Sequence, residues 1–475
     1  MPTVSECIDL AREELQKRSK DMREDSEYYE ACRVISRGSA VIPPEFRNQV
    51  ASVGYSRLYL DALTARTKID GFRTPDTPEF DDRLMDWWNI NDLEQESVVS
   101  FLETLIHGRS YISVSAPTDE DALYGHPMDV PLIRIESPRH MWADIDPRTR
   151  RVNWAVRFYR DPSSRDATDE DQQYTVYLPD RTVILVDNRR GDYTTVDEIV
   201  HDLGIVPIVP SMNRERAGDR YGRSEIIPEL RTVQDAATRI MLNMQTAADL
   251  MAVPQRLLFG VEKEAITSNI GDAAAQYKAY MAGILAFENE NGKATQFTAA
   301  ELSNYTGALQ ELARNAASYT GLPPQYLSFN SQNPASADAI RASEARLVKT
   351  CELKGSMFGK IWTQVMRVGA LVIDGKVPEQ YNRLQAILAD PSTPTYAAKA
   401  DAAMKLVAGK PIIPVEQARI DMGYTPEERA QMKEWDEQET AEYAASLLGV
   451  PSARFPLTTS SNSNENDSSP DTENQ

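Results

Sequence analysis

The chain has 475 residues, of which 41% are hydrophobic and 26% are charged, as is typical of a folded protein with about three domains. It carries 51 Lys and Arg against 72 Asp and Glu, and this net charge of −21 argues against a protein that grips nucleic acid by its phosphates. We expect no secretory leader and no membrane span, because no stretch is sufficiently apolar. Three dispersed cysteines, Cys7, Cys32 and Cys351, exclude a disulfide framework, and we expect all three to be packing residues.

The N-terminal part of the chain is predicted to be helical. A first helix is expected over residues 5–37, where apolar positions recur among many charges, and Pro43 and Pro44 separate it from a second that begins near Val50. The following segment, "DDRLMDWWNINDLEQESVVSFLETLIHG", again has one apolar face. Gly108 is placed to end it, since glycine is the preferred residue just past a helix C-terminus.

After Gly108 the pattern changes from helical to extended. Five segments alternate or run in β-branched and aromatic residues, with Pro, Asp, Asn and Gly between them: "SYISVSA", "PLIRIES", "NWAVRFY", "QYTVYL" and "TVILVD". The stretch "DIDPRTRR", Asp144 to Arg151, predicts a turn between two strands. We therefore expect an antiparallel sheet packed on the preceding helices, in an α+β, helix-rich domain that ends near Pro210.

Two long helices with a small insert between them are expected next. The first helix is predicted from about Glu225 to Ala252, and a capping box of Thr298 and Glu301 predicts that the second starts at Ala299. Between them, strands at 255–259 and 283–287, a short helix and the turn "NENGK" indicate a compact segment. The chain thus leaves along one helix and returns along another.

The second long helix is followed by an uncharged stretch, "LPPQYLSFNSQNPASA", which offers none of the side chains that a catalytic loop would provide. Ser336 is then placed to cap a helix of some ten turns, ending near Ile373. Three or four shorter helices are expected beyond it, broken at "GKPIIP" and "GYTPEE". The final "TTSSNSNENDSSPDTENQ" has no apolar residue, which predicts a disordered tail.

No catalytic constellation emerges from the sequence. The four histidines lack metal-ligand spacing and are expected at the surface or at helix ends: His107, His126, His140 and His201. "GDRYGRS", Gly218 to Ser224, has three residues where a phosphate loop has four and Arg223 where that loop has lysine. We expect a turn with closely packed glycines instead, with arginines that pair with a neighbouring subunit. No carboxylate cluster suggests a two-metal nuclease, and no cofactor is predicted.

Several segments together resemble the portal proteins of tailed bacteriophages, in particular the branch found in many actinobacterial phages. They are "YYEACRVISRGSAVIPPEFR", "IESPRHMWADIDPRTRRVNWAVRFY", "VPIVPSMNRERAGDRYGRSEIIPELRTVQDAATRIMLNMQ", "ARNAASYTGLPPQYLSF" and "ASADAIRASEARLV". The resemblance spans about residues 25–375, in the order that the family uses. The C-terminal part is similar only in being helical.

This resemblance implies the portal fold. The corresponding parts are an N-terminal helical segment (1–45), an α/β wing (46–215), two stem helices (216–252 and 299–321), a small α/β clip (253–298), a tunnel loop (322–335), a long tunnel helix (336–375), a helical crown (376–450) and a disordered acidic tail (451–475). It also implies a non-enzymatic protein that forms a ring of about twelve copies at one capsid vertex. Such a ring is the channel for DNA packaging and ejection.

The implied partners are other copies of the chain, the major capsid protein, the terminase transiently, a head-completion or connector protein, and double-stranded DNA that passes without sequence specificity. No membrane is involved. The protein would assemble in the cytoplasm of the host bacterium and remain in the virion at the portal vertex.

Two sets of site residues follow from the resemblance. An uncharged loop can touch passing phosphates weakly, whereas an arginine-rich loop would hold them, so the expected channel residues are Gln325, Ser328, Asn330, Ser331, Gln332 and Asn333. A plain linker between two helices is the alternative. The clip residues expected to dock partners, or else to form a small core and an intersubunit sheet, are Leu257, Phe259, Tyr277, Tyr280 and Met281.

Two other functions remain open on the sequence alone. A packaging nuclease or ATPase would need a complete phosphate loop or a carboxylate cluster, and neither is found. Another capsid-associated structural protein, such as a scaffold or minor head protein, would be elongated and poor in β structure, unlike the predicted sheet between Leu132 and Val186.

Overall fold

The computed structural model describes residues 2–33, 51–75, 77, 79–159, 172–187, 193–252, 256–259, 284–287, 302–327, 337–392, 396–408, 411–424 and 426–447. The chain divides into two compact units, Met1–Ser392 and Thr393–Gln475. Within the described part no helix is long and apolar enough to cross a membrane. The α+β, helix-rich fold class predicted from the sequence is confirmed.

The helices that the structure describes before residue 130 are α1 (Val4–Tyr29), α2 (Tyr55–Thr64), α3 (Asp82–Ile90), α4 (Leu93–His107) and α5 (Asp119–Leu123). The start of α1 is fixed by a capping box in which Thr3 and Glu6 satisfy each other's backbone N–H groups. The helix ends at Tyr29, earlier than the predicted residue 37. The predicted helical segment before Gly108 is two helices, because Asp92 adopts a left-handed φ of 53° between them.

The described part of residues 109–212 forms two antiparallel sheets rather than the single one predicted. The first has the order β3-β2-β9, and the second has the order β4-β5-β6-β7-β8. Their strands are β2 (Arg109–Ser115), β3 (Leu132–Glu136), β4 (Met141–Ile145), β5 (Val152–Phe158), β6 (Gln173–Tyr177), β7 (Arg181–Asp187), β8 (Tyr193–Val200) and β9 (Ile208–Met212). The predicted turn joins β4 to β5, closed by the hydrogen bond from Asp146 N to Arg151 O at 2.9 Å. β4, β8 and β9 were not predicted, so the turn joins one unpredicted strand to a predicted one. β8 is exposed over nearly its whole length, and β9 contains Pro210.

A short strand pair joins distant parts of the first unit. β1 (Ile69–Arg73) runs antiparallel to β12 (Gln385–Leu388), with Phe72 opposite Ala386. A short 3₁₀ helix, η3 (Glu379–Arg383), precedes β12. The resemblance places the start of the C-terminal helical part at residue 376, and the second compact unit begins at Thr393.

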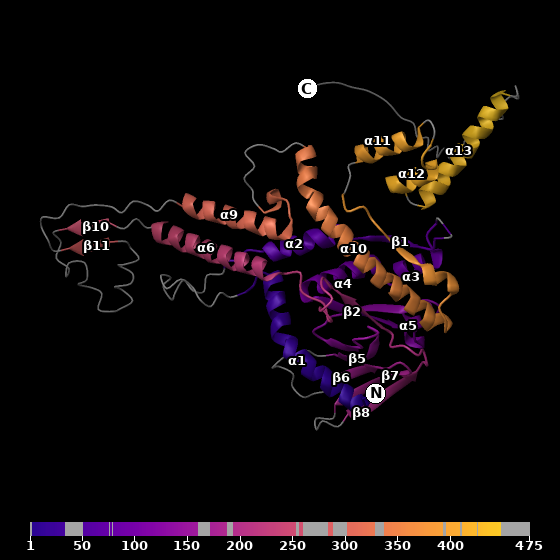
Figure 1. Ribbon diagram of the computed structural model, residues 1–475, viewed down its shortest axis with the longest axis horizontal. Coiled ribbons are helices and arrows are strands. Elements are labelled where there is room, and N and C mark those ends of the chain that lie inside the picture. Colours follow the sequence, from indigo (N-terminus) through magenta and orange to yellow (C-terminus); the bar gives the residue numbers. More distant parts are fainter. Residues whose placement is uncertain are drawn as a thin grey trace, which may run out of the picture. The chain divides into compact units, whose positions relative to one another are not determined.

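The main hydrophobic core surrounds α10 (Ala337–Asp374), which crosses the first unit (Figure 1). Phe358 stacks on Phe101 of α4 with ring centroids 4.1 Å apart. Trp362 meets Trp88 of α3 edge to face at 5.2 Å. A separate core lies between α1 and the five-stranded sheet. Large aromatic side chains on three helices therefore fix the position of α10.

The predicted pair of long helices is present as α6 (Pro228–Ala252) and α9 (Ser303–Thr320), which pack side by side (Figure 1). α9 begins at Ser303 rather than Ala299, and the proposed capping residues Thr298 and Glu301 lie outside the described residues. The insert contributes β10 (Arg256–Phe259) and β11 (Ile284–Phe287), which pair in parallel.

The second unit contains α11 (Tyr396–Val407), α12 (Val415–Met422) and α13 (Pro426–Leu447). Its helices are separated at the two predicted breaks. α12 ends at Gly423, which has a left-handed φ of 95°. The predicted tail from residue 451 lies outside the described residues.

Candidate functional site

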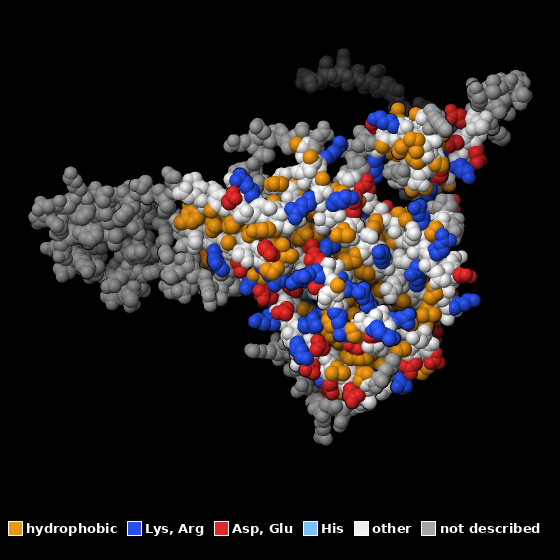
Figure 2. All heavy atoms as spheres, in the orientation of Figure 1, with side chains coloured by type: hydrophobic (Ala, Val, Ile, Leu, Met, Phe, Trp, Pro, Cys, Tyr) orange, Lys and Arg blue, Asp and Glu red, His pale blue; other side chains and the backbone are white. Residues whose placement is uncertain are grey.

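The α6–α9 pair is built on small residues at its wing end. Ala237 of α6 and Ala313, Ala316 and Ala317 of α9 are all buried. Side chains of this size allow two helix backbones to approach closely. Farther along, Met241, Leu309 and Leu312 are only partly buried, and hydrophobic side chains run along the outer face of the pair (Figure 2). The pair thus has apolar surface left after its own packing.

The segment between these helices is described only at β10 and β11. Leu257 pairs with Leu285 and Phe259 with Phe287 in the parallel register, which places two of the predicted docking residues on β10. The other three predicted docking residues lie outside the described residues: Tyr277, Tyr280 and Met281.

The base of the 322–335 loop is held by polar contacts to α10. The loop begins with a short 3₁₀ helix, η2 (Pro324–Tyr326). Gln325 donates from Nε2 to Ser343 Oγ at 2.9 Å, and the Tyr326 hydroxyl donates to Glu344 Oε1 at 2.7 Å. Arg66, just after α2, donates to both Tyr326 and Glu344, at 2.7 and 3.0 Å. Three elements thus meet at the start of the loop.

The charges at this base favour the ionised carboxylate. Burial alone would raise the pKa of Glu344, but hydrogen bonds from Tyr326 and Arg66, together with the Arg66 charge, hold that pKa below its ordinary value. Burial and the contact with Glu344 raise the pKa of Tyr326. Both groups therefore keep the ionisation states that the contact needs at neutral pH.

Arg346 closes the end of α9. Gly321 ends that helix with a left-handed φ of 76°, and a Cβ there would come within 2.8 Å of Arg346 Nε. Arg346 also donates to the carbonyl of Ser318 at 2.8 Å, which satisfies one of the free carbonyls of the last turn. The remaining predicted channel residues, Ser328, Asn330, Ser331, Gln332 and Asn333, lie outside the described residues.

A buried polar network that the sequence did not predict lies beside this base. Lys354 of α10 donates to Glu225 Oε2 at 2.5 Å and to Asn213 Oδ1 at 2.7 Å. Asn213 and Tyr59 donate to the two oxygens of Glu225, each at 2.9 Å. Burial, and then Glu225, raise the pKa of Tyr59. The lysine and the glutamate neutralise each other, so the network connects α2, α10 and the 213–225 segment without a free reactive group.

A pocket of about 560 Å³ opens next to the network. It is lined by Tyr59, Asn213, Arg214, Glu215, Glu225, Ile227, Tyr319, Thr320, Arg346, Thr350, Leu353, Lys354 and Met357. No group of three or more metal-ligating side chains occurs among the described residues. The pocket lies where α2, α9, α10 and the 213–227 segment meet.

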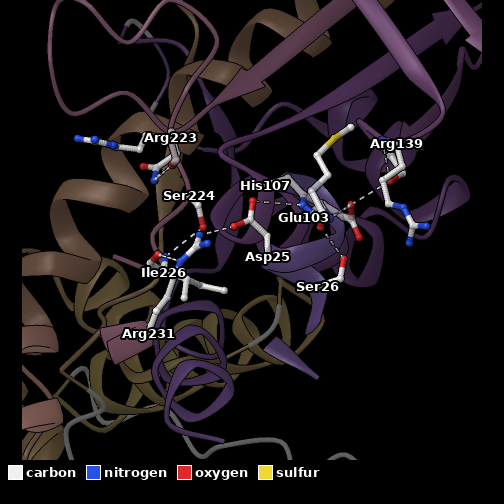
Figure 3. A network of polar contacts seen from close by, with 12 residues as sticks. Asp25, Ser26, Glu103, His107, Arg139, Arg223, Ser224, Ile226 and Arg231 are labelled. Atoms are coloured by element: carbon white, nitrogen blue, oxygen red, sulfur yellow. Dashed lines mark hydrogen bonds and ion pairs between the residues drawn. The ribbon is translucent and has the colours of Figure 1, made fainter. Parts of the chain in front are cut away.

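A second polar network ties α1 to the body of the unit (Figure 3). Arg231 of α6 donates to Asp25 of α1, whose other oxygen lies 3.8 Å from His107 Nδ1. His107 Nε2 lies 3.9 Å from Glu103 Oε2, so neither His107 contact is a hydrogen bond. His107 is the last residue of α4, as expected for a helix end, but it is buried and not at the surface.

The "GDRYGRS" segment is a structural turn. Gly222 has a φ of 78°, and a Cβ on it would collide with the carbonyl oxygen of Gly108. A Cβ on Gly108 would lie 2.6 Å from the backbone of Arg223, so both glycines are required. Gly218 has no such neighbour. Arg220 contacts Ile145 O and Asp144 of its own chain, so for this arginine the predicted pairing with a neighbour is replaced by an internal one.

The three cysteines differ in environment. Cys7 and Cys351 are buried, and burial raises the pKa of each thiol to about 11, as expected for packing residues. Cys32 is exposed, so the prediction that it packs in the interior was wrong.

Comparisons with known proteins agree with the predicted class. The family model described as "Phage portal protein, SPP1 Gp6-like" matches residues 9–443. The portal proteins of Mycobacterium phage L5 and Mycobacterium phage D29 are each 44% identical over 458 residues, covering 95% of this chain and 93% of the relative. Chains from the necks of native and empty GTA particles share 14% identity over 78% of this chain and 90% of theirs, with TM-scores of 0.39 and 0.37.

The chain therefore belongs to the phage portal protein family. It is a structural component of a phage virion, the portal at the capsid, and not an enzyme. The predicted family, function and lack of enzymatic activity are thus confirmed, and the nuclease or ATPase alternative falls away.

Proposed function

We propose that about a dozen copies of this portal protein close into a ring around the DNA path, with the 322–335 loop facing the channel. The observation that carries the proposal is the anchored base of an uncharged loop. Arg66, Tyr326 and Glu344 hold its start against α10, and Arg346 holds the end of α9. A loop fixed at its base and free of charge can narrow the channel without binding phosphates tightly.

The divisions expected from the sequence supply the remaining roles. Residues 46–215 would form the wing, α6 and α9 the stem, 253–298 the clip, α10 the tunnel helix and the helices of the second unit the crown. The half-buried Met241, Leu309 and Leu312 along the α6–α9 pair support stem contacts between neighbouring copies. The clip would dock the terminase during packaging and the head-completion or connector protein afterwards. The major capsid protein would surround the wing, and assembly would take place in the cytoplasm of the host bacterium.

The loop assignment is tested by adding charge. Asn330→Arg or Asn333→Arg places one extra cation per copy around the DNA, and even 6–10 phosphate contacts change affinity by about three to five decades over ordinary salt ranges. Rings should form normally but package DNA slowly, with the defect easing as salt rises. Asn330→Ser and Gln332→Ala are the matched controls and should package at the wild-type rate. Wild-type packaging by the arginine variants at low salt would return the loop to the linker alternative.

The clip assignment is tested by replacement. A short Gly/Ser linker in place of residues 254–297 should leave the wing folded, because its core lies elsewhere, and should abolish packaging. Truncation after Arg454 is the control, and rings should survive it because the removed residues are polar apart from Phe455, Leu457 and two prolines. Packaging by the linker variant would exclude docking at the clip.

A further inference from the structure

The loop that connects β2 to β3, residues 118–130, exposes large apolar side chains on a fixed frame. Leu123 is 86% exposed and Tyr124 is 85% exposed, and Met128 is also exposed. Apolar side chains of this size are normally withdrawn from water unless they meet a partner. Leu123 is the last residue of α5, and Tyr124 directly follows it.

This loop is ordered by its own hydrogen bonds. Thr118 and Asp121 form a capping box at the start of α5, with the Thr118 hydroxyl donating to Asp121 at 2.6 Å. Gly125 takes a left-handed φ of 85°, and the His126 ring contacts the carbonyl of Val130 at 2.9 Å. Because the backbone is fixed in this way, the exposure of Leu123 and Tyr124 is a property of the folded loop.

The 560 Å³ pocket described above has matching chemistry. Leu353 of α10 is 71% exposed at its mouth and Tyr319 of α9 is 46% exposed, with Met357 on the same wall. Leu353 lies on a helix in which the nearby Leu347, Cys351 and Phe358 are buried. The pocket therefore presents apolar surface that nothing in the described part of the chain covers.

The charges of the two surfaces are complementary. The 118–130 loop contains no Lys or Arg and has the acidic residues Asp119, Glu120, Asp121 and Asp129. The pocket is lined by Arg214 and Arg346, whose guanidinium groups contact backbone carbonyls of Asp219, Ala217 and Ser318. Neither arginine has a carboxylate partner within 4.0 Å among the residues that the structure describes. The lining also holds Lys354, which pairs with Glu225 at 2.5 Å and lies 3.6 Å from Glu215, so three cations and two carboxylates leave it with a net positive charge. Acidic residues around an apolar tip would thus meet a pocket of net positive charge.

The two surfaces cannot meet within one subunit. α5 lies at one end of the wing, and the C-terminal end of α9 lies toward the opposite end (Figure 1). Surfaces that are different and complementary join copies head to tail, which is the arrangement that closes into a ring. We propose that the 118–130 loop of one copy inserts Leu123 and Tyr124 into the Tyr319–Leu353 pocket of the next copy. This inference rests on the proposed ring and names one contact that holds it together.

The test uses the full-length chain and two variants with changes at exposed positions. Tyr124→Asp removes the apolar contact surface of the loop and leaves the pocket unchanged. Leu353→Asp removes apolar surface from the pocket and leaves the loop unchanged. Each variant alone should need a roughly thirtyfold higher concentration for half-assembly, the loss expected for a central interface residue. Sedimentation velocity measures the assembly, and circular dichroism checks the fold. Leu10→Asp, at an exposed leucine outside both surfaces, should assemble like wild type.

Mixing the two variants gives the sharpest result. A mixture contains one intact loop, on the pocket variant, and one intact pocket, on the loop variant, so it should form one-to-one dimers and no rings. Rings formed by either variant at the wild-type concentration would overturn the inference while leaving the ring itself intact. Failure of the wild-type chain to form rings would instead overturn the proposed function.

A cross-linking experiment keeps the inference testable if an aspartate variant misfolds. Tyr124→Cys and Leu353→Cys are combined in one chain with Cys32→Ser, which removes the exposed native thiol. Oxidised glutathione should then link successive copies into a ladder of multimers, because each copy has one cysteine on each surface. Either cysteine alone should give dimers at most. A double-cysteine chain that forms rings and yields no ladder would place the loop against something else.

Discussion

The two halves of α10 are held in different ways. Its C-terminal half lies among large aromatic rings, with Phe358 on Phe101 and Trp362 against Trp88. Its N-terminal half holds the base of the 322–335 loop through Ser343, Glu344 and Arg346, by hydrogen bonds and one ion pair. Buried aromatic packing contributes several kcal/mol to stability and does not depend on pH or salt. The partly exposed hydrogen bonds and ion pair contribute less, and the ion pair depends on pH and salt. One helix is therefore fixed to α3 and α4 by aromatic contacts at one end and holds the start of the loop by polar contacts at the other.

We expect the largest loss of stability from a substitution in the C-terminal half of α10, where the aromatic rings pack. Trp362→Ala should reduce the free energy of unfolding by about 3–5 kcal/mol, the usual cost of removing a buried tryptophan side chain. Trp362→Phe is the control and should cost much less, since a ring remains and the indole Nε1 has no hydrogen-bond partner among the described residues. Urea unfolding followed by circular dichroism measures both. Equal losses for the two variants would indicate that ring contact is not what fixes this half.

Lys354 lies between the two halves of α10, and its substitution should cause the second-largest loss of stability. Lys354→Ala should cost about 3 kcal/mol, because Glu225 would remain buried without its cation, although Tyr59 and Asn213 would still donate to it. Glu225→Gln in a Lys354→Met background should recover much of the loss, because no unpaired charge then remains. Urea unfolding of the single and double variants gives the coupling between them. Additive losses would exclude a buried ion pair.

Alanine substitutions at Gly321 and Gly307 of the α9 segment should change stability in opposite directions. Gly321→Ala should cost about 1–2 kcal/mol, because its left-handed φ disfavours a side chain and the new Cβ would displace Arg346. Gly307→Ala, in the second turn of α9 with nothing within 4 Å of the new Cβ, should instead stabilise by about 0.5–1 kcal/mol. Thermal unfolding measures the signs. If both substitutions destabilise, the cap geometry is not what constrains this helix end.

The smallest effect should be seen at Glu344. Glu344→Gln should cost less than about 1 kcal/mol at neutral pH, as for other partly exposed ion pairs. Because the folded-state pKa of Glu344 is lowered, its stabilising contribution is present above the ordinary value of 4.5 and is lost as pH falls below it. The difference between wild type and variant should therefore be constant from pH 7 to pH 5.5 and should shrink in more acidic solution. A difference that grows with acid would have the wrong sign for this ion pair.

The long helices were predictable and the polar contacts between them were not. Apolar residues at helical spacing predict α6, α9 and α10. Gly108 predicts a helix end because glycine is the preferred residue at that position. Lys354 and Glu225 are 129 residues apart in the sequence. A single lysine within an apolar helical pattern does not indicate which residue it pairs with, so this contact could not be predicted. β12, with four residues, is too short to show a strand period. For the 322–335 loop, the sequence predicted where it begins, but only the structure revealed how Arg66 and Glu344 hold Tyr326.

The pairing of β1 with β12 has a consequence for synthesis. Phe72 leaves the ribosome long before its partner Ala386, and at about 5–20 residues per second the delay is on the order of 15–60 s. During that time β1 is an unsatisfied strand edge, which can recruit other chains. The wing cannot be completed until nearly the whole first unit has been translated. Subunits should therefore become competent to join one another only late, which keeps nascent chains from entering a ring half-formed.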